Sequence, residues 1–577
     1  MSAEPAFKAI SRRKLAQLDS KIPQSWRLPA QWAPTGIYSV EESVTNTKYE
    51  AVNVMHVPKQ CGLLSTKQLD ITEKWDVKGL LAEMATGRLT AAEVCEAFCK
   101  RAAIAHQLTR CLTEPLFDTA QKRASYLDTH LARTGKPYGP LHGLPISVKD
   151  TFDVEGVDSS TGLARLAFKP AKRNAPLIEL LHSLGAVIIA KTNVPQTLAA
   201  LDSVNNVFGR TLNPMNRKLT AGGSSGGEGV LVAMRGSMIG FGTDIGGSIR
   251  IPAMCNGLYG FKPSTGRVPY GGQDSGGVPG RGRSSIQAVA GPIARSMSDI
   301  NMLMKEILPR SELWGEDCIP GRWASETPIL DTDAPRKFTI GVLRSDGKIE
   351  PLPPVAKVLD EVTQKLRALK GVEVVEIAAP KELGDCQSVA NALMAVDGGN
   401  VMMDILESTD ETLIPWLQTR MKRGKPATSA KLFELQAKRA ELESVMLKMW
   451  TLGSNVKKID AIIHPVAPHP VPELDRYNAV GYTSSFVLLD YPAGTIPVRN
   501  FTEADLENGK EMDSKVLSSW DKRNRELWNS NTVDRRVYID SPLSIQVLTP
   551  KLHDYDLYRA MTFIDQAVHA PKASAKL

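Results

Sequence analysis

Long hydrophobic runs are missing from this 577-residue sequence. No uncharged stretch reaches the roughly eighteen residues that a membrane-spanning helix needs. The N-terminus reads MSAEP, which lacks the apolar region of a secretory signal. We therefore expect no integral membrane anchor and a cytoplasmic location.

A concentration of charge of one sign is also missing. The chain has 70 basic and 63 acidic side chains, which leaves a formal net charge of only +7, and it has no basic arm. Proteins that bind nucleic acid carry basic patches because these neutralise phosphates, so we expect no nucleic-acid partner. The nucleotide-binding patterns G-x-x-x-x-G-K-[ST] and G-x-G-x-x-G are absent too, and we expect no cofactor.

Cysteine and histidine are scarce, which bears on disulfides and metals. The seven cysteines are an odd number in a long chain without a secretory signal, so we expect reduced thiols in an intracellular protein. Cys95 and Cys99 have helical spacing but no partner ligands, which favours core packing. His464 and His469 are accompanied by neither an H-E-x-x-H motif nor a nearby cysteine. No metal site is predicted.

Glycine and serine, by contrast, are concentrated in residues 220–252. One turn reads GGSSGG from Gly222, and a second reads GGS from Gly246, directly after a Thr-Asp-Ile loop. Such a density of glycine suits a backbone that turns sharply or approaches a ligand closely. Unpaired backbone N–H groups in such turns can bind an anion or an oxyanion. Because apolar segments flank the stretch, a flexible linker is disfavoured.

This stretch resembles the signature of the amidase signature family, serine hydrolases that cleave carboxamides with a Ser-Ser-Lys triad. The family has a lysine upstream, and the segment LHGLPISVKD supplies one at Lys149. The resemblance implies that Ser248 is the nucleophile, Ser224 the bridging serine and Lys149 the base. It also implies a cis peptide bond between Gly223 and Ser224. The segments GFKPSTGR and AGPIARS further along the chain fit the family pattern as well.

The implied chemistry explains these residue types. A serine hydroxyl becomes a good nucleophile when a base takes its proton, and a lysine can be that base only when desolvation keeps it neutral. In the family pattern Ser248 passes its proton to Ser224 and Ser224 to Lys149, and the relay then reverses to protonate the departing amine. The resemblance places the oxyanion among backbone N–H groups of the nucleophile loop, those of Ile245, Gly246, Gly247 and Ser248.

Other residues gain roles from the same resemblance. Asp244 and Arg250 support the nucleophile loop in the family, although each would otherwise be taken for a surface charge. Ser225 adjoins the bridging serine and is expected to support it. Thr243, just before the oxyanion loop, is expected on the side where the substrate binds.

The resemblance also indicates where an acyl pocket lies. Residues 194–202 match a family segment that lies against the substrate, and their small and apolar side chains are suited to shape such a pocket. Leu198 is the expected contact residue. Helices in residues 390–453 are expected to line the pocket as well, since this region often does so in the family.

Two rival assignments come from the residues themselves. The glycine turn also fits G-x-S-x-G, the nucleophile elbow of α/β-hydrolases, with Ser225 as nucleophile. That elbow must follow a strand, and residues 213–218 before the turn are rich in turn formers instead. Lys191, at the end of an apolar strand, is a rival base, but the resemblance assigns that role to Lys149.

The predicted fold class is α/β. Helical and strand-like patterns alternate over residues 176–193 and again over residues 338–377, as in a sheet covered by helices. The resemblance implies the amidase signature fold, a large mixed β-sheet core with helices on both faces. We expect one amidase signature domain over residues 71–577. Before it, residues 1–70 form an N-terminal extension that wraps the surface with a short helix near residues 12–19.

The resemblance implies an amidase that hydrolyses monocarboxylic acid amides to the carboxylate and ammonia or an amine through an acyl-serine intermediate. A small-molecule amide is thus the expected partner. Within the family, the N-terminal extension and the segment GYTSSFVLLDYP resemble the acetamidase-type branch of fungi. Long-chain fatty acid amides, such as N-acylethanolamines, and xenobiotic or secondary-metabolite amides stay open as substrates.

Alternatives from other classes are a glutamine-dependent amidotransferase subunit, which needs partner subunits, and a catalytically idle scaffold. The presence of Lys149, Ser224 and Ser248 together disfavours the scaffold. A homodimer is left open. The tripeptide Ala-Lys-Leu at residues 575–577 resembles a variant of the Ser-Lys-Leu peroxisomal address, so the peroxisome is the alternative location.

Overall fold

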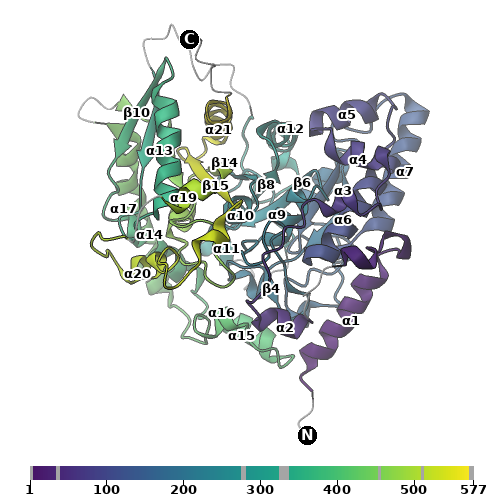
Figure 1. The fold of residues 1–577 in the computed structure, drawn as a ribbon, viewed down its shortest axis with the longest axis horizontal. Helices are drawn as coiled ribbons and strands as arrows, with labels where there is room; N and C mark the ends of the chain where they lie inside the picture. Colours follow the sequence, from purple (N-terminus) through teal and green to yellow (C-terminus); the bar gives the residue numbers. More distant parts are fainter. Residues whose placement is uncertain are drawn as a thin grey trace.

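An eleven-stranded sheet runs through the middle of the molecule (Figure 1). The computed structural model describes residues 4–33, 39–273, 281–323, 337–452, 457–507 and 512–570. The strands lie in the order β1-β3-β2-β6-β8-β7-β14-β15-β13-β9-β10. Their bounds are β1 Leu112–Pro115, β2 Pro145–Lys149, β3 Val187–Thr192, β6 Ile239–Asp244, β7 Tyr259–Lys262, β8 Val289–Ala294, β9 Phe338–Leu343, β10 Val372–Ile377, β13 Ala461–Pro465, β14 Ala493–Asn500 and β15 Pro542–Leu548.

The sheet is mixed. Strand β2 pairs in parallel with β3 and β6, and β9 pairs in parallel with β10 and β13. The strands between these two groups, β8, β7, β14 and β15, run antiparallel to their neighbours. Parallel pairs require crossover connections, which helices supply here. The predicted α/β class and the large mixed sheet are therefore confirmed.

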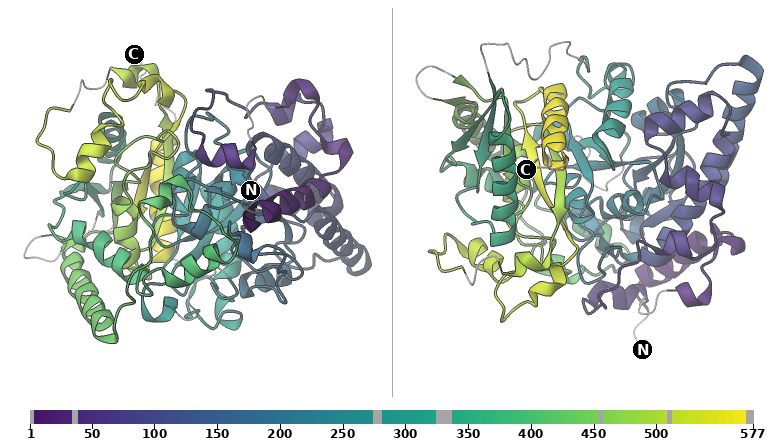
Figure 2. Two further views of the ribbon diagram at one scale, coloured as in Figure 1. Left: turned by 90° about the horizontal axis from the view of Figure 1, so that it is seen from below. Right: turned by 45° about the horizontal axis from the view of Figure 1, so that its top comes forward.

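Helices cover both faces of the sheet, as Figures 1 and 2 show. Neighbouring residues of a strand point to opposite faces. In β14, Gly494 lies against α21 (Asp554–His569), and the next residue, Thr495, donates a hydrogen bond to the first residue of α10 (Arg250–Cys255). Helix α9 (Gly226–Ala233) packs against α10 and against β2, β3 and β6. The first glycine turn therefore enters the α10 side of the sheet.

Short-range sequence signals set the bounds of several elements. Thr90 and Glu93 form a capping box at the start of α6 (Ala91–Thr109). Strands β9 and β10 span residues 338–343 and 372–377. Between them, α13 (Pro353–Arg367) buries its apolar side chains against the sheet.

The N-terminal segment does more than cover the surface, because one of its charged side chains is buried in the interior. Its helix α1 (Ala6–Ser20) is longer than the helix predicted near residues 12–19. Lys14 is only 1% exposed and forms ion pairs with Glu114 of β1 and, at 2.5 Å, with Asp158. Buried carboxylates need such a partner because an unpaired charge is costly away from water. The helix thus supplies a charge that the interior requires.

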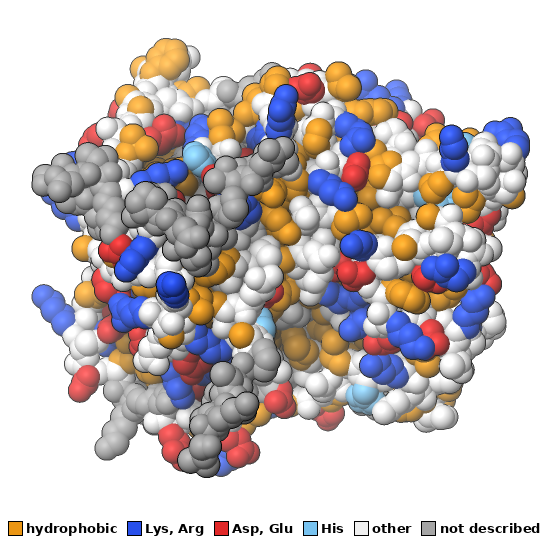
Figure 3. Space-filling view, turned by 90° about the horizontal axis from the view of Figure 1, so that it is seen from above, with side chains coloured by type: hydrophobic (Ala, Val, Ile, Leu, Met, Phe, Trp, Pro, Cys, Tyr) orange, Lys and Arg blue, Asp and Glu red, His pale blue; other side chains and the backbone are white. Residues whose placement is uncertain are grey.

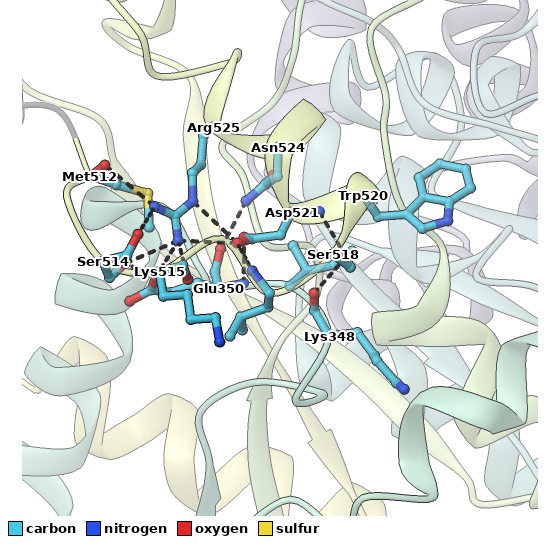
Figure 4. A network of polar contacts seen from close by, with 12 residues as sticks. Lys348, Glu350, Met512, Ser514, Lys515, Ser518, Trp520, Asp521, Asn524 and Arg525 are labelled. Carbon is cyan, nitrogen blue, oxygen red and sulfur yellow. Dashed lines mark hydrogen bonds and ion pairs between the residues drawn. The ribbon is translucent and has the colours of Figure 1, made fainter.

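In the connection between β14 and β15, the described residues 501–507 and 512–541 include a polar network around α20 (Figure 4). Arg525 of α20 (Ser519–Arg525) donates to Glu350 Oε2 at 2.9 Å. Asp521 of the same helix accepts from the backbone amide of Glu350 at 3.0 Å. The network fastens this long connection to the loop that follows β9.

The loop that follows β9 in turn contacts α18 (Gly481–Leu488), the helix that lies next to the second glycine turn. The hydroxyl of Tyr482, near the start of α18, donates to the backbone oxygen of Ile349 at 2.6 Å. Ile349, Ala479 and Tyr482 also form a small buried apolar cluster. Every residue of α18 is buried, so the helix is a fixed wall behind the second glycine turn.

The surface seen in Figure 3 carries basic, acidic and apolar side chains interspersed, without one basic patch on that face. Across the described ranges, no helix is both long and apolar enough to cross a bilayer. The tripeptide at residues 575–577, which resembles a peroxisomal address, lies outside the described residues.

Candidate active site

Lys149 lies at the end of β2, in the interior of the sheet, and is inaccessible to solvent. Its Nζ donates to Ser224 Oγ at 2.7 Å and to Thr243 Oγ1 at 2.7 Å. Ser224 belongs to the first glycine turn, and Thr243 belongs to β6, which is the parallel neighbour of β2. The structure therefore brings Lys149 and Ser224 together, and it places the Thr243 hydroxyl on the lysine.

Burial sets the basicity of Lys149. Removal from water disfavours the charged amine and lowers its pKa to about 7, although the carboxylates of Asp244 and Glu228 oppose this shift. A substantial fraction of the amine is therefore neutral at neutral pH. Because only a neutral amine accepts a proton, this lysine is suited to act as a general base.

The backbone around Ser224 is closely packed. The Gly223–Ser224 peptide bond is cis, as the family resemblance implies. A Cβ atom at Gly223 would lie 2.7 Å from the backbone oxygen of Ala200, so only glycine lets these two segments approach. Ser224 itself is 3% exposed. It forms a buried connection between the interior lysine and the glycine turns.

Ser248 lies in the second glycine turn, between β6 and α10, and is 7% exposed. Within the described part of the chain, its hydroxyl makes no hydrogen bond, and none joins it to Ser224. A Cβ atom at the neighbouring Gly246 would meet nothing within 4 Å. The serine hydroxyl is therefore available to a bound ligand, and there is open space beside it.

One of the four backbone amides predicted to face an oxyanion is already used. The Gly247 amide donates to Asp244 Oδ1 at 2.7 Å, so an acceptor inside the loop already engages it in this structure. The aspartate side chain caps the turn three residues ahead of it, which the sequence pattern does not reveal. The other amides of the loop have no acceptor among the residues that the structure describes, namely those of Ile245, Gly246 and Ser248.

Asp244 and Arg250 form a buried ion pair that fixes the loop between them. Arg250 Nε and Nη2 donate to the two carboxylate oxygens of Asp244 at 3.0 and 3.1 Å. Burial opposes the negative charge of Asp244, but Arg250 outweighs burial, and the pKa of Asp244 lies below its ordinary value. Arg250 also donates to Gln546 Oε1 at 3.0 Å and to the backbone oxygen of Thr483 at 2.9 Å. Sequence reasoning missed both of these partners.

Thr483 supports the nucleophile loop from α18. Its Oγ1 donates to the backbone oxygen of Gly246 at 2.6 Å. Gly247 has a φ of 128°, a conformation that favours glycine, and a Cβ atom there would collide with the hydroxyl of Thr483. The second glycine turn is thus held by a helix that is distant in sequence, since Thr483 and Gly246 are 237 residues apart.

The structure does not support Ser225 as a nucleophile. Ser225 is fully buried, and its Oγ accepts from the backbone amide of Thr243 at 3.4 Å. The preceding residues 213–219 form no strand, so the strand-to-helix context of a nucleophile elbow is missing. Ser225 instead packs between α9 and β6, which agrees with a supporting role.

Lys191 points away from Lys149. Its neighbour on β3, Thr192, faces α9, so strand alternation turns Lys191 to the opposite face. There its Nζ donates to the backbone oxygen of Asp158 at 2.6 Å and to Ser159 Oγ at 2.7 Å. Lys191 therefore holds a loop on the far side of the sheet, and it does not contact Ser224.

Leu198 ends a short 3-10 turn whose last two residues have φ values of 62° and 61°. Such left-handed conformations are unfavourable for residues with a side chain. The side chain of Gln196 holds the turn, because it donates to Glu411 Oε1 at 2.7 Å and accepts from the amide of Ile414 at 2.9 Å. Leu198 is half-buried, and its contact with a substrate stays a prediction.

The histidines and cysteines considered for metal binding have other partners. His464 Nδ1 contacts the backbone oxygen of Leu343 at 2.7 Å, and His469 Nδ1 contacts that of Pro470 at 2.8 Å. Cys95 and Cys99 are buried in the apolar core. The described residues contain no group of three or more His, Cys, Asp or Glu side chains that could hold a metal ion.

Glu228 is a buried residue of the site that sequence reasoning missed. It lies in the first turn of α9 and accepts from Ser147 Oγ at 2.6 Å and from Thr192 Oγ1 at 2.7 Å. Burial raises its pKa to about 8, against the effect of the two hydroxyls and of Lys149. The sequence offers one signal for Glu228, namely a charged residue directly after Gly226 and Gly227. The structure shows that both of these glycines are buried.

Comparison with known proteins adds to this geometry. A family model described as Amidase matches residues 93–558. The chain is 34% identical over 557 residues to the acetamidase of Emericella nidulans, covering 95% of this chain and 96% of that relative. It is also 34% identical over 577 residues to Amidase FG08078 of Gibberella zeae, covering 98% of this chain and 100% of that relative. Among solved structures, a fatty acid amide hydrolase matches with a TM-score of 0.85 and 27% identity, covering 97% of this chain and 95% of that chain.

Proposed function

The chain belongs to the amidase family, and on that basis we propose that it hydrolyses monocarboxylic acid amides through an acyl-Ser248 intermediate. The products are the carboxylate and ammonia or an amine. The observation that carries this proposal is the 2.7 Å hydrogen bond between Lys149 Nζ and Ser224 Oγ, two side chains that are buried from solvent. It joins a lysine of lowered pKa to the serine that receives the nucleophile's proton in the proposed relay.

In the proposed first step, the Ser248 hydroxyl attacks the amide carbon. Its proton moves to Ser224 as the Ser224 proton moves to Lys149, so the lysine becomes an ammonium group. The new bond joins Ser248 Oγ to the carbon, and the carbonyl electrons move to the oxygen. A pKa of about 7 lets Lys149 take the proton and later release it.

In the proposed second step, the C–N bond breaks and the leaving nitrogen takes a proton back through Ser224 from Lys149. Water then attacks the acyl carbon, and the bond from this carbon to Ser248 Oγ breaks. The same relay takes a proton from the water and returns it to Ser248 Oγ, and the acid leaves as its carboxylate. One lysine thus acts as base and then as acid, which requires no second titrating group. Removal of such a proton relay typically costs about 10²–10⁴-fold in rate.

The proposed oxyanion site uses the amides of Ile245, Gly246 and Ser248. The engaged Gly247 amide supports the proposal in another way, because its bond to Asp244 holds the turn that presents the other three. Preorganised donors need no rearrangement when the charge develops, and each contributes about 3–4 kcal/mol to lowering the barrier.

Whole-length similarity to an acetamidase supports a short aliphatic amide as the substrate. The match to a fatty acid amide hydrolase structure over 97% of this chain favours long-chain amides as the second candidate. An amidotransferase subunit is the weaker alternative. Hydrolysis of an amide by the purified chain, without other subunits, distinguishes an amidase from such a subunit.

A fluorophosphonate probe tests the nucleophile. We expect it to label the purified protein, to leave Ser248→Ala unlabelled and to label Lys149→Ala more slowly. Acetamide, benzamide and a long-chain acylethanolamide, assayed in parallel, then assign the substrate class. Labelling that persists in Ser248→Ala but disappears in Ser225→Ala would refute the assignment and favour the nucleophile elbow.

A further inference from the structure

The first glycine turn is held at Gly222 by two fully buried hydroxyl groups. The backbone amide of Gly222 donates to Thr220 Oγ1 at 2.9 Å, and its backbone oxygen accepts from Ser203 Oγ at 2.9 Å. Ser203 Oγ also accepts from the amide of Gly226 at 3.0 Å, at the start of α9. The two hydroxyls therefore fix the backbone before and after Ser224.

Asp202 orients the hydroxyl of Thr220. This hydroxyl has one proton, which it donates to Asp202 Oδ1 at 2.9 Å. Its lone pairs are then left to accept from the amide of Gly222. Asp202 directly precedes Ser203, so one short segment supplies both contacts to the turn. A Cβ atom at Gly223 would lie only 3.1 Å from the backbone nitrogen of Asp202, which shows how closely this segment packs against the turn.

The carboxylate of Asp202 is in turn held by Arg210. The two side chains form a buried ion pair, and Arg210 Nη2 also pairs with Asp475 Oδ2 at 2.9 Å. The same guanidinium group donates to two backbone oxygens near the end of α2 (Val40–Thr45), at 3.0 and 3.2 Å. A buried carboxylate is costly without such a partner. The N-terminal extension thus helps to hold the group that orients Thr220.

We propose that Asp202, through Thr220, is a positioning residue for Ser224 in its proton transfer to the catalytic lysine. Ser203 acts on the same turn from its other side. The inference rests on the relay of the proposed function, in which Ser224 Oγ must stay at hydrogen-bond distance from Lys149 Nζ, 2.7 Å in this structure. The three positioning residues neither give nor take a proton in the step, and they act through the backbone of the turn.

Thr220→Val tests this role. Valine resembles threonine in shape, but it has no acceptor for the amide of Gly222 and no donor for Asp202. We expect kcat to fall about 10²-fold, the effect of misplacing a reacting group by about 1 Å. We expect KM to stay at the wild-type value, because the lost contacts support the relay and not the bound substrate. Thr220→Ser keeps the hydroxyl, and we expect it to recover most of the lost kcat.

Thr363→Val is the matched control. Thr363 of α13 is also a buried threonine, and its hydroxyl donates to the backbone oxygen of Leu359 at 2.7 Å. The substitution removes the same group from a helix that lies between β9 and β10 in the chain, and we expect kcat to equal that of the wild type. A kcat for Thr220→Val as high as that of Thr363→Val overturns the positioning role, and so does an equal loss in Thr220→Ser.

Should Thr220→Val fail to fold, Ser203→Ala replaces it. This change removes the donor to the Gly222 oxygen and the acceptor of the Gly226 amide, and we expect the same loss of kcat at an unchanged KM. A rise in KM at an unchanged kcat would indicate a substrate contact and overturn the inference. An unchanged kcat also overturns it, but leaves the proposed function intact as long as probe labelling depends on Ser248. Labelling that persists in Ser248→Ala refutes the relay itself.

Discussion

The guanidinium group of Arg250 grips both carboxylate oxygens of Asp244, and neither side chain reaches solvent. The two residues bracket the nucleophile loop, so the pair closes the loop at its base. Asp244 also accepts from the amide of Gly247 inside the loop. The position of Ser248 therefore depends on the buried salt bridge between Asp244 and Arg250, which does not contact Ser248 directly.

Arg250→Ala is expected to destabilise the fold and to disable the site. It leaves the buried Asp244 carboxylate without its cationic partner, which typically costs about 3–5 kcal/mol. Thermal unfolding and kcat/KM measure the two effects. Arg344→Ala is the control, because its ion pairs with Glu376 and Asp360 are exposed and are worth less than about 1 kcal/mol. Equal unfolding temperatures for both variants would contradict the supporting role of Arg250.

The rate of hydrolysis is expected to rise with pH through a midpoint near 7. The pKa of Lys149 is lowered to about 7 by burial, and only the neutral amine accepts the serine proton. Below that pH the ammonium form accumulates, so kcat/KM for acetamide falls about tenfold per pH unit, whereas above it the rate levels off. A midpoint near the pKa of an exposed lysine, about 10.4, would show that Lys149 is not the base or is not desolvated.

Two glycine substitutions in one loop are expected to differ. Gly247→Ala places a Cβ atom against the hydroxyl of Thr483 at a φ of 128°, so the loop must rearrange. We expect kcat/KM to fall about 10²–10³-fold, as when an oxyanion donor is lost. In Gly246→Ala the new Cβ atom meets nothing within 4 Å, and the unfolding temperature is expected to stay unchanged. A comparable fall in unfolding temperature for both variants would argue against this steric account.

Lys14→Met is expected to destabilise the protein even though residue 14 lies in the N-terminal extension. It leaves Asp158 without its lysine partner and Glu114 with only the partly exposed Lys21, and we expect a cost of about 3–5 kcal/mol in the free energy of unfolding. The control is Lys8→Met on the same helix, whose ion pair with Glu41 is partly exposed and worth less than about 1 kcal/mol. Denaturant unfolding of both variants measures the difference. A near-zero cost for Lys14→Met would show that the buried ion pairs of Lys14 do not stabilise the fold.

Much of the site was predictable because its chemistry demands local patterns. The close approach of Gly223 to the backbone of Ala200 and the positive φ of Gly247 both require glycine, so the two turns are visible as glycine in the sequence. A lysine at the end of an apolar strand is expected to be buried, and Lys149 is. The alternation of strand, helix and strand over residues 338–377 was also predictable, because it is a local pattern of apolar residues.

Other features could not be predicted, because nothing near them in sequence marks them. The family resemblance implies four oxyanion-binding amides in the nucleophile loop, but the availability of the Gly247 amide depends on the direction of the Asp244 side chain. Thr483 and Gln546 are ordinary polar residues until α18 and β15 come to lie against Arg250. From the sequence, Glu228 would be expected on the exposed face of a helix. It is buried only because α9 packs onto the sheet.

The sequence by itself determined the class of fold, the two glycine turns and the identity of the groups that can do acid–base chemistry, because backbone geometry and apolar periodicity are local properties. The tertiary structure alone decided which of these groups meet, how basic Lys149 is and what holds the nucleophile loop. Arg250 and its partner Gln546 are 296 residues apart. Desolvation and hydrogen bonding depend on distances in space, and those exist only once the sheet has brought its distant strands together.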